Sequence, residues 1–417
     1  MPKIIKVNVD RLRRDVESLS EFIDPDAYGY TRISFSDEDR QARNYIRELM
    51  EKEAGLNVRV DAVGNMIGRR EGKLAGPCIM VGSHLDTVPG GGRFDGIVGV
   101  VAGLEVARGF EKSNISLRHP LEVVIFLAEE PSPFGISTVG SRGMTGKLSN
   151  EILKSLKDPD GRSLFEAIQQ MGGNPSNIAA SSKSSEDVLA YIELHIEQGS
   201  SLFSLDIPVG VVTGIVGIHR GNIQITGRID HSGTTPMEAR RDALAAASEA
   251  ILSFEEICKN MDGVVGTFGR IEISPNSLNV VPGSAELGMD LRSLDECKAK
   301  EAIALIRKAF DKIEDRRGVL INSEIELSSK PVIFDTKMVK RIGQVCSSLK
   351  IPFIEMPSGA GHDANHIAEL APVGMIFIPS KNGRSHCPDE WSEFEHICFG
   401  TEILAEVIVS IDKEGQT

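Results

Sequence analysis

The chain is poor in cysteine and has no paired cysteine motif. Only six of its 417 residues are cysteine, and no two of them form a Cys-x-x-Cys pair. In a chain of this length, scattered cysteines argue against a disulfide framework and against zinc held by thiolates. We therefore expect buried or idle thiols and a cytoplasmic location, where the environment is reducing.

The chain also lacks long apolar runs and an excess of positive charge. No apolar stretch reaches the roughly 20 residues that span a bilayer. The segment from Lys3 to Arg13 is charged and lacks the apolar core of a signal peptide. The formal net charge is −14, with acidic and basic residues interspersed. Because binding to nucleic-acid phosphates needs a positive surface, neither nucleic acid nor a membrane is expected as a partner.

The remaining composition is that of an ordinary globular protein, and its length favours two domains. We predict helices at Val9–Phe22 and at about Asp37–Glu53, with Asp37 as the N-cap. Strand and helix patterns then alternate to about residue 213, which is typical of a mostly parallel α/β sheet. Gly172–Asp187 is rich in Gly, Ser, Asn and Pro and is predicted to be a surface loop.

A different pattern occupies residues 214–329. Its predicted elements follow the order β-α-β-β-α-β, which is typical of a ferredoxin-like domain: Asn222–Asp230, Arg240–Asn260, Val264–Ile273, Ala285–Arg292, Asp295–Arg316 and Val319–Leu327. We interpret this segment as a domain inserted into the first one, which would comprise residues 1–213 and 330–417.

Histidine and glutamate side chains follow four apolar runs that resemble buried parallel strands. The runs are Ile79–Val81, Val123–Leu127, Leu189–Ile192 and Met375–Ile378, and the residues that follow them are His84, the Glu129-Glu130 pair, His195 and, after a short loop, His386. In open α/β sheets, ligands gather beyond the carboxyl ends of the strands. The sequence therefore predicts a metal site at one edge of the sheet.

Two aspartates near His84 strengthen this interpretation. Asp86 is a candidate to orient the His84 imidazole, because a metal-ligating histidine usually donates its other N–H to a carboxylate. Asp95 lies in the glycine-rich segment Gly90–Gly96 and could bridge two ions. Alone, His84 would be interpreted as a buried core histidine. With both aspartates beside it, metal binding is favoured.

The other candidates are ambiguous one by one and informative together. Glu129 and Glu130 could form a solvated acidic loop, but adjacent strand residues point in opposite directions, so one could bind metal while the other faces substrate. His195 and His386 could each be structural. Together, three histidines, Asp95 and one glutamate would fill two three-ligand sites that share a bridge, with positions left for water and substrate.

With these motifs the chain resembles the ureido-amidohydrolase branch of the dinuclear metallopeptidase-like superfamily. This branch includes N-carbamoyl-L-amino acid hydrolases, β-ureidopropionases and allantoate amidohydrolases, and the resemblance covers nearly the whole chain. It implies that His84, Asp95 and His195 hold one divalent metal ion, and that Asp95, Glu130 and His386 hold a second. Glu129 would be the general base. The oxygen and nitrogen ligand set suits Zn²⁺, Mn²⁺ or Co²⁺.

The resemblance also implies substrate-binding residues. His231, in His231–Met237, would polarise the scissile carbonyl from the inserted domain, which would act as a lid and as the contact of a homodimer. Asn279 and Arg292 would bind the substrate carboxylate, although without the resemblance a salt bridge from Arg292 to Asp290 or Asp295 would be preferred. A further set would contact substrate from the first domain, namely Gln198, Gly359 and Ala360, with His362 and Asp363 supporting the site.

The implied activity is hydrolysis of the ureido group of N-carbamoyl-L-amino acids to an amino acid, ammonia and carbon dioxide. Allantoate amidohydrolase and β-ureidopropionase are the alternatives, followed by a dipeptidase or aminoacylase. In peptidase relatives the ligand at the position of His195 is typically an acid, which favours the ureido branch. A binding protein without activity would have no need of Glu129. One departure, Pro131-Ser132-Pro133 after the glutamate pair, leaves the identity of the substrate open.

Overall fold

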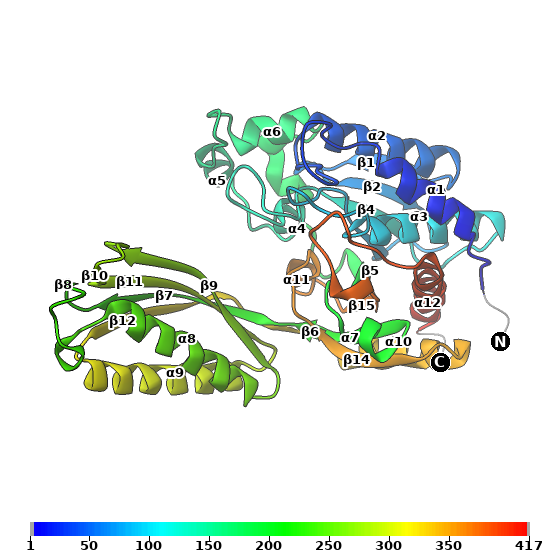
Figure 1. The fold of residues 1–417 in the computed structure, drawn as a ribbon. Coiled ribbons are helices and arrows are strands. Elements are labelled where there is room, and N and C mark those ends of the chain that lie inside the picture. Colours follow the sequence, from blue (N-terminus) through cyan, green and yellow to red (C-terminus); the bar gives the residue numbers. More distant parts are fainter. Residues whose placement is uncertain (1–3, 415–417) are drawn as a thin grey trace. The chain divides into compact units, whose positions relative to one another are not determined.

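The computed structural model describes residues 4–414 and forms two compact units (Figure 1). The first unit comprises the chain up to Thr213 and from Phe334 onward, and the second comprises Gly214–Ile333. The second unit extends beyond residue 329 because β13 (Val332–Ile333) pairs with Ile215 and Gly214 at the end of β6 (Val209–Ile215).

A nine-stranded sheet organises the first unit. Its order is β1-β2-β4-β3-β5-β15-β6-β13, with β14 paired to β6. The strands not yet bounded are β1 (Asn57–Val60), β2 (Met66–Arg70), β3 (Cys78–His84), β4 (Leu121–Phe126), β5 (Val188–Ile196), β14 (Phe353–Ser358) and β15 (Val373–Ile378). The four central strands β4, β3, β5 and β15 run parallel, and antiparallel strands flank them. The carboxyl ends of these four strands therefore meet at one edge.

Strands β3, β4 and β15 are buried along their whole length, and β5 is buried except at Leu189, because helices cover the sheet. Helix α3 packs against β3 and β4, and α12 packs against β5, β15 and α3. The helices of this unit are α1 (Val9–Leu19), α2 (Asp37–Lys52), α3 (Ile97–Lys112), α4 (Val139–Met144), α5 (Asn150–Ser155), α6 (Leu164–Gln170), α7 (Ser201–Leu205), α10 (Thr336–Leu349), α11 (Ala364–Ile367) and α12 (Phe394–Asp412).

Three local predictions differ from the structure. The N-cap of α2 is Ser36, whose hydroxyl accepts the Asp39 N–H, and Asp37 is the first helical residue. Helix α1 ends at Leu19, before Phe22. The predicted loop at residues 172–187 contains a 3₁₀ helix, η1 (Pro175–Ser181), begun by a proline that fixes the backbone angle. A second 3₁₀ turn, η3 (Lys381–Gly383), precedes His386.

The second unit is a four-stranded antiparallel sheet in the order β12-β7-β11-β9. Its elements are β7 (Gly217–Thr226), β8 (Asp230–His231), η2 (Met237–Ala239), α8 (Ala243–Lys259), β9 (Val264–Ser274), β10 (Val280–Val281), β11 (Ser284–Ser293), α9 (Glu296–Arg317) and β12 (Leu320–Ser329). Helices α8 and α9 contact one another and the sheet. Their small and aromatic residues, such as Ala246 and Phe310, form this unit's own core with Ile223 and Leu287.

Among residues 4–414, no helix is both long enough and apolar enough to cross a membrane.

The close packing of β3 on β4 generates a stability prediction. A Cβ atom at Gly82 would lie 1.9 Å from the Val124 carbonyl oxygen. Gly82→Ala should therefore force the two strands apart and destabilise the first unit by about 3 kcal/mol, measured as a lower midpoint in calorimetric unfolding. Gly269→Ala in β9 is the matched control, because a Cβ atom there would meet no atom within 4 Å. An unchanged midpoint for Gly82→Ala would contradict the described pairing.

Candidate metal centre

Two of the predicted ligands are fixed by the parallel strands. His84 is the last residue of β3, and His195 lies near the end of β5, opposite Phe377 of β15. Both imidazoles are buried, and their ring centroids are 6.0 Å apart. The His84 ring requires Gly96 beside it, because a Cβ atom there would lie 2.4 Å from the ring.

The Asp95 carboxylate lies between two groups of ligands. Its Oδ1 atom is 3.6 Å from His84 Nε2 and 3.2 Å from His195 Nε2. Its Oδ2 atom is 3.2 Å from His386 Nε2, which is itself 3.4 Å from Glu130 Oε1. One carboxylate thus presents one oxygen to each group, as a bridging ligand would.

In each group the three potential ligand atoms are close enough to bind one metal ion. The ligand atoms of His84, Asp95 and His195 all lie within 4.8 Å of one another, and so do those of Asp95, Glu130 and His386. Imidazole nitrogens combined with carboxylate oxygens fit Zn²⁺, Mn²⁺ or Co²⁺. The His386 side chain is 46% exposed whereas that of His84 is 2% exposed, so the second group is the more accessible to solvent. The residues present therefore fit divalent metal ions.

The glutamate pair leaves the sheet in a turn. Strand β4 ends at Phe126, and Ala128 has a left-handed φ of 51°. Glu129 Oε2 then faces His84 Nε2 at 3.8 Å, whereas Glu130 faces His386. The two carboxylates diverge, as predicted, but a backbone turn separates them rather than strand alternation.

Asp86 contacts His84, as predicted, and also the glutamate turn. His84 Nδ1 is 3.0 Å from the backbone carbonyl oxygen of Asp86 and 3.7 Å from its carboxylate. The carboxylate also accepts the backbone N–H groups of Glu129 at 3.3 Å and Glu130 at 3.0 Å. Asp86 therefore orients the imidazole through its main chain and holds the glutamate turn through its side chain.

The surroundings of Asp95 and Glu129 shift the pKa values of these two carboxyl groups in opposite directions. Burial opposes ionisation of Asp95, but His195, His386 and His84 outweigh it and hold the pKa of Asp95 well below its usual range. Burial raises the pKa of Glu129 well above its usual range, with His84 opposing and Glu130 adding to the effect. A bound cation would favour the charged forms.

Gln198 contacts the bridging carboxylate. Its Nε2 atom is 2.6 Å from Asp95 Oδ2 and 3.2 Å from His386 Nε2. Its backbone has a left-handed φ of 59°, and its N–H donates to Ser380 Oγ at 3.0 Å. The Gln198 side chain thus lies beside two of the candidate metal ligands.

Glu390 was missed by the sequence analysis. It is 1% exposed and accepts the backbone N–H groups of Phe94 at 2.8 Å and Asp95 at 3.1 Å. It also accepts the Ser385 hydroxyl at 2.8 Å and the His386 N–H at 3.4 Å. One carboxylate therefore ties together the two loops that carry Asp95 and His386. Its position four residues after His386 was the only signal for it in the sequence.

A further cluster adjoins the first group of ligands. Glu193, His195 and His362 also place ligand atoms within 4.8 Å of one another. The His362 ring packs edge-on against His195, at a centroid distance of 4.5 Å, and its Nε2 is 2.9 Å from Ser358 Oγ. Glu193 accepts hydrogen bonds from Ser83 and Tyr191. These partners hold the His195 side of the site in place.

The glycine-rich loop after β14 and the proline segment have clear local structures. Ser358 Oγ accepts the Ala360 N–H at 3.2 Å, and a Cβ atom at Gly359 would meet no atom within 4 Å. Asp363 accepts the Ser141 hydroxyl.

In the Pro131–Phe134 segment, Phe134 packs edge-on against Phe35 in the core. In this turn after the glutamates Ser132 and Phe134 are buried, whereas Pro131 and Pro133 are exposed.

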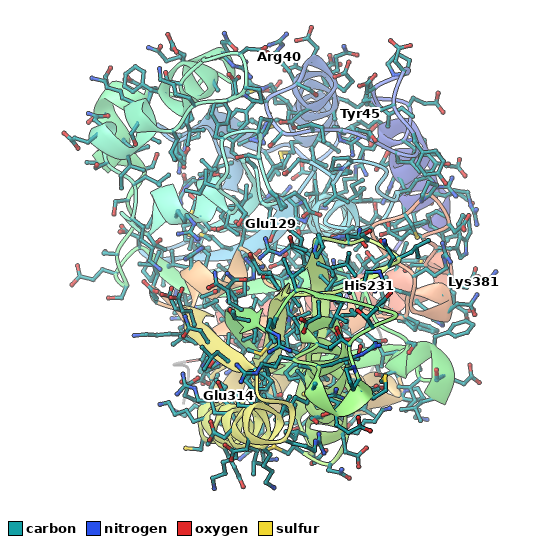
Figure 2. The ribbon with its side chains drawn as sticks, turned by 60° about the vertical axis from the view of Figure 1, so that its left-hand side comes forward. Arg40, Tyr45, Glu129, His231, Glu314 and Lys381 are labelled. Carbon is teal, nitrogen blue, oxygen red and sulfur yellow. The ribbon has the colours of Figure 1, made fainter. Side chains whose placement is uncertain are left out.

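Three predicted substrate-binding residues lie in the second unit, and the structure brings only two of them together. His231 pairs with Val280, and Ser232 N–H donates to the Asn279 carbonyl at 3.1 Å. Arg292 lies near the other end of β11 and forms a salt bridge with Asp290 at 2.7 Å. Arg292 lies eight positions after Ser284 in β11, which corresponds to about 26 Å of strand. Figure 2 shows Glu129 in the first unit and His231 in the second.

This fold and this site define a class, a mixed α/β hydrolase with candidate divalent-metal ligands at the edge of its central sheet. The sequence profile of peptidase family M20/M25/M40 matches residues 80–410, so the chain belongs to this family.

Individual relatives match over nearly their whole length. The chain is 38% identical to an N-carbamoyl-L-amino-acid amidohydrolase of Paenarthrobacter aurescens, over 98% of this chain and 99% of that protein. It is 33% identical to the allantoate amidohydrolase of Escherichia coli strain K12, over 94% and 95%. The crystal structure of an amidase of the hydantoinase/carbamoylase family from Burkholderia multivorans has a TM-score of 0.91 and 35% identity, over 98% and 99%.

The four contacts of Glu390 generate a prediction about metal affinity. In Glu390→Gln, an amide donor replaces one carboxylate oxygen, so the loops of Asp95 and His386 lose acceptors. Metal dissociation constants, measured by calorimetric titration of the metal-free protein with Mn²⁺, should rise by roughly 10- to 100-fold. Asp389→Asn is the matched control, because that neighbouring side chain is 76% exposed. Equal affinities in the two variants would contradict this role for Glu390.

Proposed function

We propose that the protein is a metal-dependent amidohydrolase that hydrolyses the ureido group of N-carbamoyl-L-amino acids to an amino acid, ammonia and carbon dioxide. The observation that carries the chemistry is the position of Asp95 between two ligand groups, with the buried Glu129 beside them. The substrate class is supported by the full-length similarity to N-carbamoyl-L-amino-acid amidohydrolases. The similarity to an allantoate amidohydrolase makes allantoate the second candidate substrate.

Two divalent ions, held by His84, Asp95 and His195 and by Asp95, Glu130 and His386, would acidify the attacking water and polarise the scissile carbonyl. Zn²⁺, Mn²⁺ and Co²⁺ are the candidates.

The side chains of the chain supply the proton transfers and the orientation. Glu129 accepts a proton from the water as its oxygen bonds to the carbamoyl carbon, and returns it to the leaving nitrogen as the C–N bond breaks. Gln198, Gly359 and Ala360 would contact the substrate from the first unit, and His231 would donate to the oxygen that becomes negative. The carbamate released would decompose to ammonia and carbon dioxide.

The second unit would be a ferredoxin-like lid and dimerisation domain, and the first a catalytic domain. The main helices and strands of the second unit follow the order β7-α8-β9-β11-α9-β12, which supports the ferredoxin-like assignment. Arg292 and Asn279 would hold the substrate carboxylate, because a guanidinium can pair with it through two hydrogen bonds. Asn279 precedes Ser284 in the chain, and Ser284 lies about 26 Å along β11 from Arg292, much farther than a small ureido acid extends. We therefore propose a homodimer in which one subunit supplies Arg292 and the other supplies His231 and Asn279. A cytoplasmic location stays a prediction.

The substrate assignment is tested by ammonia release from the Mn²⁺-loaded protein, with N-carbamoyl-L-methionine, N-carbamoyl-β-alanine and allantoate as substrates. A dipeptide, with amine release as readout, is the control. Turnover of the carbamoyl-L-amino acid is expected to be the fastest. Preference for allantoate would keep the mechanism and change the substrate. Cleavage of the dipeptide without ureido turnover would contradict the proposal.

The role of Glu129 leads to a second prediction. Glu129→Gln keeps the shape of the side chain but cannot accept a proton, so kcat should fall by about 10²- to 10⁴-fold. The metal content, measured by atomic emission, should stay the same. Glu166→Gln, at an exposed carboxylate of a helix N-terminus, should leave kcat unchanged. Undiminished ammonia release by Glu129→Gln would remove this residue from the mechanism.

The separation of Arg292 from His231 leads to a third prediction. Arg292→Ala and His231→Ala should each be inactive alone. If the two residues act in different subunits, mixed dimers have one intact site. Unfolding and refolding an equal mixture should then restore roughly a quarter of the wild-type activity, because half of the dimers are mixed and each carries one site of two. No recovery in the mixture, with wild-type refolding as control, would show that one subunit supplies both residues.

A further inference from the structure

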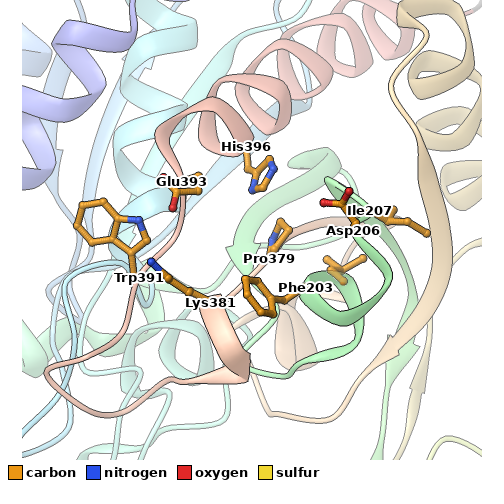
Figure 3. Close-up of a pocket in the computed structure, with 9 residues that line it drawn as sticks. Phe203, Asp206, Ile207, Pro379, Lys381, Trp391, Glu393 and His396 are labelled. Carbon is orange, nitrogen blue, oxygen red and sulfur yellow. The ribbon is translucent and has the colours of Figure 1, made fainter.

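A cavity in the first unit is lined by residues other than the candidate metal ligands. Its volume is about 440 Å³, and helix α7, the segment after β15 and the start of α12 enclose it (Figure 3). This size falls within the roughly 300–1,000 Å³ of small-molecule sites. Among the described residues that line it there is no candidate metal ligand and no proposed substrate-binding residue.

One part of the lining is apolar. Phe203 and Ile207 come from α7 and the residues that follow it, and Trp391 contributes its indole ring. Phe203 is 43% exposed, although it is a large aromatic residue. An exposed aromatic side chain at the wall of a cavity is a surface that an apolar group could cover.

The rest of the lining carries charges of both signs. Lys381 provides a positive charge, and Asp206 and Glu393 provide negative charges. In Figure 3 the Lys381 and Glu393 side chains lie toward the same end of the cavity, near Trp391. All three residues are exposed, and His396 also lines the cavity. A simple anion would face two carboxylates there, and a simple cation would face Lys381. A zwitterion can pair with both signs.

We propose that this cavity is a second binding site, for a free α-amino acid with an apolar side chain. The carboxylate of the ligand pairs with Lys381, its ammonium group pairs with Glu393 or Asp206, and its side chain covers Phe203 and Trp391. The choice of an amino acid among zwitterions rests on the proposed function, because an amino acid would be the product of that reaction.

The position of the cavity gives the site a connection to the metal loops. Lys381 N–H donates to the Trp391 carbonyl at 2.8 Å. The Trp391 ring packs edge-on against Phe94, the residue before Asp95, at a centroid distance of 5.3 Å. Trp391 also directly follows Glu390. A ligand that covers Trp391 would thus contact a residue that packs on the loop of Asp95 and directly follows Glu390, which holds that loop and the loop of His386.

Trp391 is the only tryptophan of the chain, so its fluorescence reports on this cavity. We would titrate the full-length, Mn²⁺-loaded protein with L-norleucine and follow Trp391 emission. A saturable change is expected. Hexanoate, which lacks the ammonium group, and pentylamine, which lacks the carboxylate, should each bind about tenfold more weakly, because each loses one charge-assisted contact.

Variants assign the binding to the cavity. Lys381→Met and Glu393→Gln should each weaken L-norleucine binding about tenfold. Lys340→Met, at an exposed lysine of α10, should have no effect. Arg292→Ala should also leave the fluorescence titration unchanged, because Arg292 belongs to the proposed substrate site.

Two results would overturn the proposal. One is the absence of a fluorescence change together with the absence of a second binding event in calorimetry. The other is binding that Arg292→Ala abolishes while Lys381→Met and Glu393→Gln leave it intact. A protein that binds L-norleucine through Lys381 and Glu393 but releases no ammonia from ureido substrates would contradict the proposed function and leave the second site standing.

Discussion

The position of one carboxylate, Asp95, determines how the rest of the site is built. Its two oxygens face different groups of ligands, so the loops and strands that carry those ligands must all approach one point. The parallel pairing of β3, β5 and β15 delivers the two buried histidines to that point. Glu390 holds the backbone of Asp95 and that of His386 together. The strands and loops of the first unit thus position the candidate ligands around the Asp95 carboxylate.

This arrangement concentrates negative charge in a place where it is unfavourable. Asp86, Asp95, Glu129 and Glu130 are all buried within a short distance of one another. Burial of like charges raises the free energy of the folded protein unless cations compensate. The raised pKa values of Glu129 and Glu130, the latter about 7, show this conflict in the protein alone. Bound cations would relieve it, which agrees with a site for divalent metal ions.

The sequence could predict much of the fold and of the site, because the ligands follow buried strands. His84, the glutamate pair and His195 could be placed at one sheet edge from hydrophobic runs alone. The approach of Asp95 to His386 depends on loops far apart in sequence, so a shared bridge could be inferred from the residue types, and the resemblance to a family assigned each ligand to a metal ion. Glu390 was missed because it acts on backbone N–H groups, which leave no pattern of residue types. The carboxylate of Asp86 lies 3.7 Å from His84 Nδ1 and also accepts the backbone N–H groups of the glutamate turn, a second task that the sequence did not indicate. The separation of Arg292 from His231 depends on strand register, which spacing does not reveal.

The most direct test of the account is anomalous diffraction from a crystal of the Mn²⁺-loaded protein, recorded near the manganese absorption edge. The account predicts two peaks per subunit on opposite sides of the Asp95 carboxylate, one within bonding distance of His84 and His195 and one within bonding distance of Glu130 and His386. A single peak, or a peak among Glu193, His195 and His362 in place of the pair, would contradict the shared carboxylate on which the account rests.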